Sequence, residues 1–372
     1  MESNNNRLSR IFFVLPIIIS FLIGTQISYL QRVFPSSASS YYYYSVFLWD
    51  TTTSSSSTDE PPKKSSSSST TTLEQQQSLS DFNLAYDESY GYFTTISNDE
   101  WILRKTYAST ANQYHRYVTS PKRFWEKPSI WHYNNYNPIF SCPYNIRVGG
   151  IGDGPKYTCD PHRLKDVVTQ RKKDREKQQQ QQRSSSSTTT SLTTTTESHP
   201  EFDCLIYSIG SNGNYQWEDG MYEINGGGIC EIHVFDYSQN YTRKKNLGRN
   251  IHFHQIGLQG SQRPSRSKFM SFPQIVQHFN HTNRIIDIFK IDCEGCEWST
   301  YLDWISYPHI RQVLIETHNL PSNKTMGLHF FDSFQQNNLY MYSKEVNPWG
   351  GGSCVEYSYI KLSETFSDAT VL

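Results

Sequence analysis

The sequence predicts an α/β domain built on a mostly parallel, doubly wound sheet, and three observations support this fold class. From residue 203 onward, short apolar runs recur, each about as long as a strand. Segments with helical character separate several of these runs, and strands that alternate with helices are typical of a parallel sheet. Two β-rich runs near the C-terminus are joined by a glycine-rich turn. They predict an antiparallel pair that closes the sheet.

Five apolar runs are the candidate parallel strands: DCLIYSIG (203–210), ICEIHVFD (229–236), IHFHQIGL (251–258), RIIDIFKID (284–292) and RQVLIETH (311–318). Helices are expected at QWEDGMYEI after the first strand, at SFPQIVQHFN before the fourth and at WSTYLDWI after it. The closing pair consists of LYMYSKEVN (339–347) and CVEYSYIKL (354–362).

The N-terminus predicts a membrane anchor. Residues 11–30 carry no charge and are predominantly apolar, and Arg7 and Arg10 precede them. A helix needs roughly 20 such residues to span a bilayer. We expect an uncleaved signal anchor, with a cleaved signal peptide as the alternative. Positive charge before the span favours a cytosolic N-terminus and a luminal body. The expected protein is therefore a single-pass type II membrane protein of the Golgi or another secretory-pathway membrane.

The composition divides the chain into five parts. Residues 1–34 hold the cytosolic tail and the signal-anchor helix, and residues 35–80 form a Ser/Thr-rich stem that we expect to be disordered. Residues 81–168 are the aromatic, glycine-rich beginning of the luminal domain. Residues 169–199 run from RKKDREK through glutamines to serines and threonines, which predicts a disordered insertion in a surface loop. Residues 200–372 contain the predicted sheet.

Charge and cysteine content narrow the function classes. The net charge of −1 provides no basic field, so no nucleic-acid partner is expected. Seven cysteines in a luminal chain predict disulfides and at least one free thiol. Cys142 and Cys159 bracket a glycine-rich turn and are the first expected pair. Cys204 and Cys230 each begin a candidate strand, and they are the second expected pair if those strands are neighbours.

The turn after the first strand, in IYSIGSNGNYQWE (206–218), predicts a ligand site. Gly210 and Gly213 let the backbone approach a ligand, and the next helix points its positive end toward the same place. Asp236 closes the second strand, where an acid commonly accepts hydrogen bonds from both ribose hydroxyls. Together these features favour a nucleoside ligand over an ordinary strand–turn–helix connection. The turn lacks the GxGxxG pattern of dinucleotide enzymes.

The block IDIFKIDCEGCEW ends the fourth strand with several chemically active side chains. Strand tips are where open α/β sheets bind their ligands. We expect Lys290 to pair with a carboxylate. Cys293 and Cys296 form a CxxC that, alone, suggests a redox pair or half of a zinc site. No second CxxC accompanies it, so these readings are disfavoured.

Residues from about 140 to 362 resemble a eukaryotic family of methyltransferase-like proteins related to FkbM-type S-adenosylmethionine-dependent methyltransferases. The matching stretches are CPYNIRVGGIGDGPKYTCD, IYSIGSNGNYQWE, CEIHVFD, FHQIGL, DIFKIDCEGCEW, VLIETH, YSKEVN and CVEYSYIKL. The resemblance implies a Rossmann-like class I methyltransferase sheet, with residues 200–372 as the methyltransferase domain and S-adenosyl-L-methionine as the methyl donor.

The resemblance also implies donor-binding roles for individual residues. Gly210, Ser211, Asn212 and Gly213 would line the methionine moiety, and Asp236 would hold the ribose. The chain departs from the pattern at Ser208, where methyltransferases usually carry an acid for the methionine amino group. Glu218, farther along the same segment, is the candidate substitute.

The fourth strand places Asp292 beside the expected position of the donor's sulfonium. Methyl transfer needs mainly alignment, and an oxygen nucleophile must also lose its proton. Asp292, Glu294 and His318, which closes the neighbouring strand, are the candidate bases. Alternatively, the same three residues bind a divalent cation that acidifies the hydroxyl, or they have structural roles only.

The leading hypothesis is therefore a methyltransferase that O-methylates a glycan or another secretory-pathway substrate. A Golgi-type glycosyltransferase shares the type II plan with a stem, but the chain offers only Asp292-Cys293-Glu294 in place of an Asp-x-Asp motif. A non-catalytic pseudo-methyltransferase that binds a partner is the third hypothesis, supported by Ser208.

Overall fold

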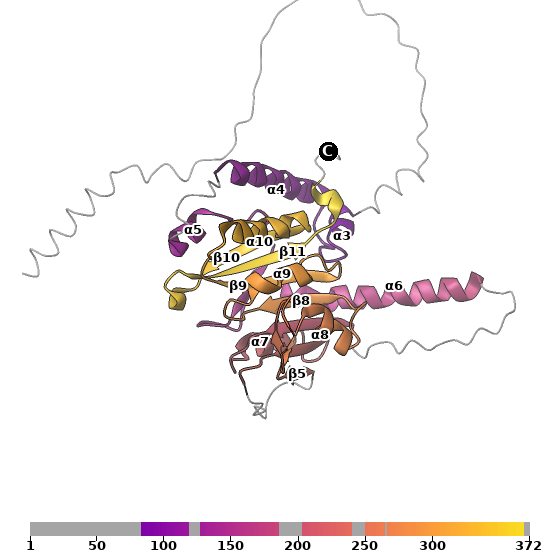
Figure 1. Cartoon of the computed structure of the whole chain (residues 1–372). Helices are drawn as coiled ribbons and strands as arrows, with labels where there is room; N and C mark the ends of the chain where they lie inside the picture. Colours follow the sequence, from indigo (N-terminus) through magenta and orange to yellow (C-terminus); the bar gives the residue numbers. More distant parts are fainter. Residues whose placement is uncertain (1–82, 119–126, 186–202, 240–249, 265, 368–372) are drawn as a thin grey trace, which may run out of the picture. The chain divides into compact units, whose positions relative to one another are not determined.

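The computed structural model describes residues 83–118, 127–185, 203–239, 250–264 and 266–367, and its centre is a seven-stranded mixed sheet (Figure 1). The strand order is β10-β11-β9-β8-β3-β4-β5. The strands are β3 (Cys204–Ile209), β4 (Cys230–Phe235), β5 (Ile251–His254), β8 (Ile286–Ile291), β9 (Ile310–His318), β10 (Leu339–Val346) and β11 (Cys354–Lys361). The sheet confirms the Rossmann-like α/β fold.

The pairing of the strands creates a crevice at the centre of the sheet. Strands β5, β4, β3, β8 and β9 run parallel to one another, and β11 is antiparallel to both β9 and β10. The chain passes from β3 outward to β4 and β5, and then returns to place β8 on the other side of β3. The carboxyl ends of β3 and β8 therefore meet at the point where the strand order reverses, which is where such sheets bind ligands.

Helices cover both faces of the sheet and bury the central strands β3 and β8 along their whole length, which explains their nearly continuous apolar runs. On one face, α3 (Leu84–Glu88), α4 (Asn98–Val118), α6 (Leu164–Ser185) and α7 (Gln216–Ile224) share a hydrophobic core with Ile206. On the other face, α5 (Pro128–Asn134), α8 (Phe272–His278), α9 (Glu297–Trp304) and α10 (Lys324–Gln336) pack on Leu205 and Tyr207. Successive strand residues point to opposite faces, so one strand supplies both cores.

The helices begin at recognisable capping residues. Before α8, Ser271 and Gln274 form a reciprocal capping box, which satisfies backbone N–H groups at the helix start. Asn323 caps α10 by accepting a hydrogen bond from the Met326 N–H. The three helices that the sequence predicts correspond to α7, α8 and α9, while α10 was not expected.

Smaller elements complete the described part of the chain. Strands β1 (Asn145–Val148) and β2 (Lys156–Cys159) form an antiparallel hairpin around the glycine-rich block. The predicted strand 251–258 is divided into β5 and β6 (Gly257–Leu258), and β6 pairs with β7 (Phe269–Met270). Three short 3₁₀ helices are η1 (Pro161–Arg163), η2 (Pro348–Gly350) and η3 (Glu364–Ser367).

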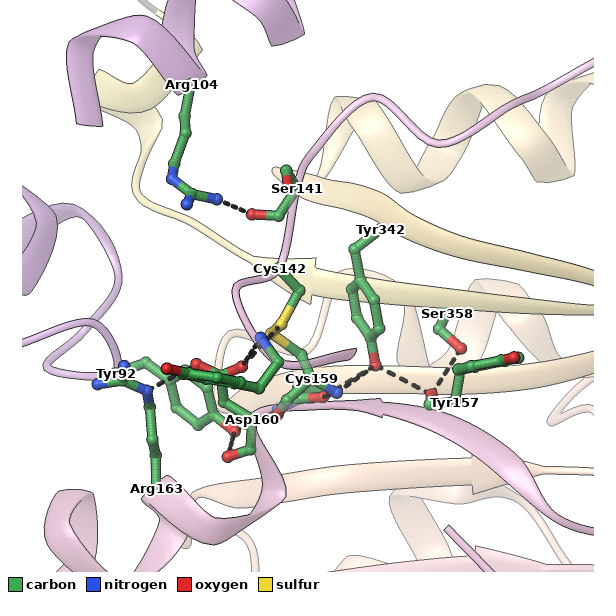
Figure 2. Close-up of a disulfide and its surroundings, with 12 residues drawn as sticks. Tyr92, Arg104, Ser141, Cys142, Tyr157, Cys159, Asp160, Arg163, Tyr342 and Ser358 are labelled. Atoms are coloured by element: carbon green, nitrogen blue, oxygen red, sulfur yellow. Dashed lines mark hydrogen bonds and ion pairs between the residues drawn. A yellow bond between two sulfur atoms is a disulfide. The ribbon is translucent and has the colours of Figure 1, made fainter. Parts of the chain in front are cut away.

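A disulfide fixes the end of the β1–β2 hairpin, as Figure 2 shows. Cys142 and Cys159 are bonded, which confirms the first expected pair. The Cys159 N–H donates to the hydroxyl of Tyr342 on β10 at 3.1 Å, and that hydroxyl donates to the carbonyl of Tyr157 at 3.2 Å. Ser358 on β11 donates to the same carbonyl. The hairpin is thus bound covalently and by hydrogen bonds to the face of the sheet.

The second expected disulfide is also present. Cys204 and Cys230 are bonded, and they are register partners on the neighbouring parallel strands β3 and β4. A third disulfide joins Cys293 to Cys296, and Cys354 carries a free thiol.

The expected disorder of residues 169–199 is wrong for its first part. Residues 169–185 continue α6 (Figure 1), and two of their arginines form ion pairs with acidic residues of the sheet region. Arg171 lies 2.8 Å from Asp287, and Arg175 pairs with Asp203. These ion pairs are tertiary contacts that composition cannot reveal. Residues 186–199 lie outside the described residues.

The predicted stem and the predicted membrane span at residues 11–30 also lie outside the described residues. Among the helices of the described ranges, none has the length and apolar character required to cross a membrane.

Candidate active site

A cavity of about 650 Å³ opens at the carboxyl ends of β3, β4 and β8. Its walls come from the turn after β3, the tip of β4, the segment around β6 and the loop after β8. Of the residues predicted to bind the donor or catalyse the reaction, it brings together Gly210, Ser211, Asn212, Asp236, Asp292 and Glu294. Its volume is typical of a small-molecule site.

Gly210 lets the turn after β3 pack directly on the tip of β8. Its φ of +76° lies in the left-handed region, and a Cβ at this position would lie 1.7 Å from the carbonyl oxygen of Asp292. Any side chain would therefore push the two strand ends apart. The sequence places glycine here because two backbones meet beside the cavity.

Asp236 binds the turn from the tip of β4. One carboxylate oxygen accepts from the backbone N–H groups of Ser211 at 3.0 Å and Asn212 at 2.7 Å. The other accepts from the backbone and hydroxyl of Ser238. Burial opposes ionisation of Asp236, but these hydrogen bonds outweigh it and lower its pKa. Asp236 therefore shapes the turn, and its contact with a ribose stays a prediction.

Ser208 and Glu218 lie beneath the cavity instead of lining it. Both are fully buried. The Ser208 hydroxyl donates to Glu218, and Lys290 Nζ lies 3.5 Å from the same carboxylate oxygen. The contact with Glu218 confirms the expected pairing of this lysine with a carboxylate. Lys290 also donates to the carbonyl of Gly210 at 3.3 Å. Glu218 is not among the residues that line the cavity. One of its carboxylate oxygens is engaged by Ser208 and Lys290, and the other is buried without a hydrogen-bond partner among the described residues, so its contact with the donor stays a prediction.

Gly213 also lies outside the cavity wall, with a φ of +76° and the Gln239 side chain as its neighbour. Gln259 is a cavity residue that the sequence did not reveal. Its carboxamide oxygen is buried and has no hydrogen-bond partner among the described residues. Apolar Phe235 and Leu258 stand in the same wall. This wall suits a nucleobase, because its amino group would donate to the orphan oxygen while the ring contacts apolar surface.

The three predicted catalytic residues meet at the edge of the cavity. His318 Nε2, at the end of β9, lies 3.8 Å from Asp292 Oδ1 and 3.6 Å from Glu294 Oε2. Glu294 is 85% exposed, whereas Asp292 and His318 are mostly buried. The sequence thus predicted the proximity of these groups correctly. Asp292 and Glu294 follow β8, His318 ends β9, and the two strands are adjacent and parallel.

Lys156, on β2 of the hairpin, is a charged residue at the site that the sequence did not identify. Its side chain is 1% exposed, and Nζ lies 3.0 Å from Asp292 and 3.0 Å from Glu316. It also pairs with Glu356. Glu316 and Glu356 are register partners on β9 and β11. A lysine within the glycine-rich block and acids inside two apolar strands were the features of the sequence that could have indicated this buried cluster.

The electrostatics of the site separate Asp292 from His318. Burial disfavours the Asp292 carboxylate, but Lys156 and Lys290 outweigh it and lower its pKa to about 2. Burial likewise disfavours a charged His318, but Glu297, Glu316 and Asp292 raise its pKa to about 9. At neutral pH His318 is therefore an imidazolium, and Asp292 is a weakly basic carboxylate. Neither group has the pKa near 7 that suits a general base.

The CxxC forms the loop between these groups. The Cys293–Cys296 disulfide closes a turn in which Glu294 and Gly295 both have positive φ. Its sulfurs are bonded to each other and are not zinc thiolates in this structure. The loop holds Glu294 at the mouth of the cavity.

The fold and the site together define a Rossmann-like protein with a nucleoside-sized cavity at the switch point of its sheet. The chain belongs to a methyltransferase-domain family, whose model matches residues 83–361. Membership confirms S-adenosyl-L-methionine as the methyl donor.

Solved structures with similar folds include two archaeal fibrillarins. Fibrillarin from Aeropyrum pernix, crystallised with natively bound S-adenosyl-L-methionine, is 11% identical, with a TM-score of 0.30 and coverage of 42% of this chain and 66% of that chain. The alignment thus spans slightly less than two thirds of that fibrillarin. The Methanococcus jannaschii fibrillarin pre-rRNA processing protein is 9% identical (TM-score 0.30), with coverage of 44% and 68%.

The 16S rRNA methylase ArmA is 13% identical, with a TM-score of 0.26 and coverage of 42% of this chain and 74% of that chain. No curated protein matches the chain.

Proposed function

We propose that this protein transfers the methyl group of S-adenosyl-L-methionine to a hydroxyl of a glycan or another secretory-pathway substrate. Within its family, we place it closest to eukaryotic, FkbM-type enzymes on the motifs given above. The observation that carries the proposal is the cavity in which the Gly210 turn, Asp236 and Asp292 converge. When bound, S-adenosyl-L-methionine supplies a methyl group on a sulfonium that a nucleophile can attack.

The donor would be held along the cavity from the tip of β3 to the segment around β6. The backbone of Gly210–Asn212 would contact the methionine part, and Asp236 would lie at the ribose. Gln259 would accept a hydrogen bond from the adenine amino group. Each of these contacts uses a polar group that already lines the cavity.

The acceptor would enter beside Asp292 and Glu294, where the methyl group must point. Fixing the two reactants in near-attack geometry can lower the barrier by about 7–11 kcal/mol. The rigidity of this edge supports such a role, because Lys156 holds Asp292 and the disulfide holds the Glu294 loop. The carboxylates around the acceptor would also bind its hydroxyl groups.

We also propose that the domain is luminal, in a type II membrane protein of the Golgi or a neighbouring membrane. Three disulfides support an oxidising compartment. In sealed microsomes, a C-terminal epitope should resist protease until detergent is added. Digestion without detergent would contradict the luminal orientation.

Transfer can be tested with methyl-labelled S-adenosyl-L-methionine and panels of glycans, glycopeptides and peptides. The proposal predicts labelled methyl ethers on sugar hydroxyls, and at least a 100-fold lower rate for Asp292→Asn. Labelled N-methyl groups or base-labile esters on peptides would overturn the hydroxyl assignment. A rate that Asp292→Asn leaves unchanged would remove Asp292 from the reaction.

A further inference from the structure

Three carboxylate oxygens lie within 4.0 Å of His318 Nε2 at the edge of the cavity. Around His318 Nε2 lie Glu294 Oε2 at 3.6 Å, Asp292 Oδ1 at 3.8 Å and Glu316 Oε1 at 4.0 Å. These distances are too long for good hydrogen bonds. They suit two ligands of one metal ion, because metal–ligand bonds of about 2.1 Å place neighbouring ligand atoms roughly 3–4 Å apart.

Lys156 orients two of these carboxylates toward the histidine. Oδ2 of Asp292 accepts from Lys156, and Oδ1 faces His318. Likewise, Oε2 of Glu316 accepts from Lys156, and Oε1 faces His318. Asn347 donates to Glu316 Oε1 at 2.8 Å and fixes it further. Lys156 therefore fixes one oxygen of each carboxylate, and the other oxygen of each lies within 4.0 Å of His318 Nε2.

A carboxylate stands behind the second nitrogen of His318, at ion-pair distance and without a hydrogen bond. Nδ1 lies 3.4 Å from Oε1 of Glu297, which is fully buried. Glu297 is itself held by the backbone N–H groups of Gly295 at 2.9 Å and His318 at 2.6 Å. A carboxylate behind the imidazole fixes the ring and directs Nε2 at the ion.

The neighbouring charges provide an independent reason for a cation. Glu356 lies directly opposite Glu316 in the β9–β11 register and gives Oε1 to Lys156. Its side chain is 7% exposed, and Oε2 has no hydrogen-bond partner among the described residues. Lys156 thus serves three buried carboxylates. Burial, Glu316 and Asp292 raise the pKa of Glu356 well above its ordinary value, and a cation beside this cluster would offset the repulsion between the carboxylates.

We propose that Asp292, Glu316 and His318 bind a divalent cation, with exposed Glu294 as a fourth ligand. Several carboxylate oxygens with one imidazole suit Mn²⁺, and Mg²⁺ shares the preference for oxygen. The ion would lie beside the cavity, because Asp292 and Glu294 line it.

The role of the ion rests on the proposed methyl transfer. A hydroxyl bound to the cation loses its proton more readily. Its oxygen then forms a bond to the methyl carbon as the carbon–sulfur bond breaks. The sulfur keeps the electron pair, and the hydroxyl proton passes to water. A cation at this position would therefore activate the acceptor hydroxyl directly beside the cavity.

The site can be tested on the full-length protein with Mn²⁺ alone. After treatment with a chelator, Mn²⁺ binding is followed by electron paramagnetic resonance, without donor or acceptor. The wild type should bind one ion per chain, and Glu316→Gln and His318→Gln should each weaken binding at least tenfold. Glu345→Gln is the matched control, since Glu345 lies in the same row of the sheet but pairs with Arg147.

Three outcomes would overturn the site. The folded wild type would fail to bind Mn²⁺, Glu345→Gln would weaken Mn²⁺ binding as much as Glu316→Gln does, or Cys354→Ser would weaken it. The last would place the thiol, which lies close to Glu316 and His318, among the ligands. Circular dichroism verifies that each variant folds, and His318→Ala replaces a variant that does not.

Calorimetry with S-adenosyl-L-methionine in the absence of metal separates the two proposals. Donor binding without Mn²⁺ binding overturns the cation site alone. Mn²⁺ binding without donor binding overturns the proposed function and leaves the cation site in place.

Discussion

Lys156 Nζ lies 3.0 Å from Asp292 Oδ2, across 136 residues of sequence. The contact joins the β1–β2 hairpin to the tip of β8 and gives the hairpin a role at the site. The contact explains the function of a glycine-rich block that is far in sequence from the strands that form the cavity. The block places the buried ammonium group of Lys156 among the carboxylates at the edge of the sheet.

Replacing Lys156 with methionine should destabilise the protein by about 3–5 kcal/mol, because three buried carboxylates lose their counterion. Arg147→Met is the control, since its pair with Glu345 is partly exposed and should contribute about 0–1 kcal/mol. Urea unfolding measures both values. Equal losses would show that Lys156 is not the counterion of the cluster.

Gly210→Ala should lower the unfolding free energy by more than about 2 kcal/mol and abolish donor binding, because the new Cβ meets the Asp292 carbonyl. Gly226 has a similar φ of +72° but has open space where a Cβ would lie. Gly226→Ala should therefore cost only about 1 kcal/mol. Thermal unfolding and donor titration check both variants, and matching melting temperatures would refute the close approach.

Gln259→Leu should weaken S-adenosyl-L-methionine binding about five- to tenfold, which corresponds to one hydrogen bond of about 1 kcal/mol. The variant should be at least as stable as the wild type, because it removes a buried oxygen without a partner. Gln336→Leu, at the end of α10 and exposed, is the control. Unchanged affinity in Gln259→Leu would place the adenine elsewhere.

Glu231 should make stability depend on pH in the acid range. Burial opposes its ionisation, but His233 and Arg284 outweigh burial and lower its pKa to about 2. A carboxylate with a lowered folded-state pKa stabilises the protein above its unfolded pKa, and this stability is lost as the pH falls through the folded value. Glu231→Gln should therefore cost about 1–3 kcal/mol at pH 7.

The difference between wild type and Glu231→Gln should shrink as the pH falls from about 4.5 toward 2. Urea unfolding at several pH values measures it, with Glu223→Gln as an exposed control. A difference that stays constant with pH would contradict the lowered pKa.

The sequence predicted most of the sheet because buried parallel strands consist of nearly continuous apolar residues, as in residues 203–210 and 284–292. Adjacent strand starts also predicted the Cys204–Cys230 disulfide correctly. Composition misled at residues 169–185, since a Lys-, Arg- and Gln-rich segment gives no sign of its ion pairs to Asp287 and Asp203.

The site was predicted in part for a similar reason. Asp292, Glu294 and His318 end adjacent strands, so topology alone brings them together. Lys156, Glu316 and Glu356 come from three separate strands, and only their three-dimensional packing shows that they form one cluster. The role of Glu218 stays a prediction, and its position beneath the cavity, beside Lys290, could not be seen from its distance to the turn in sequence.

The most direct test of the account is calorimetric binding of S-adenosyl-L-methionine and S-adenosylhomocysteine to the full-length protein. Asp236→Asn is the test variant, and Asp332→Asn, on α10 and bonded to Tyr136, is the control. The account predicts micromolar binding of both ligands, at least tenfold weaker in Asp236→Asn and unchanged in Asp332→Asn. No binding by the folded wild type would contradict the donor site, and equal binding by both variants would remove Asp236 from it.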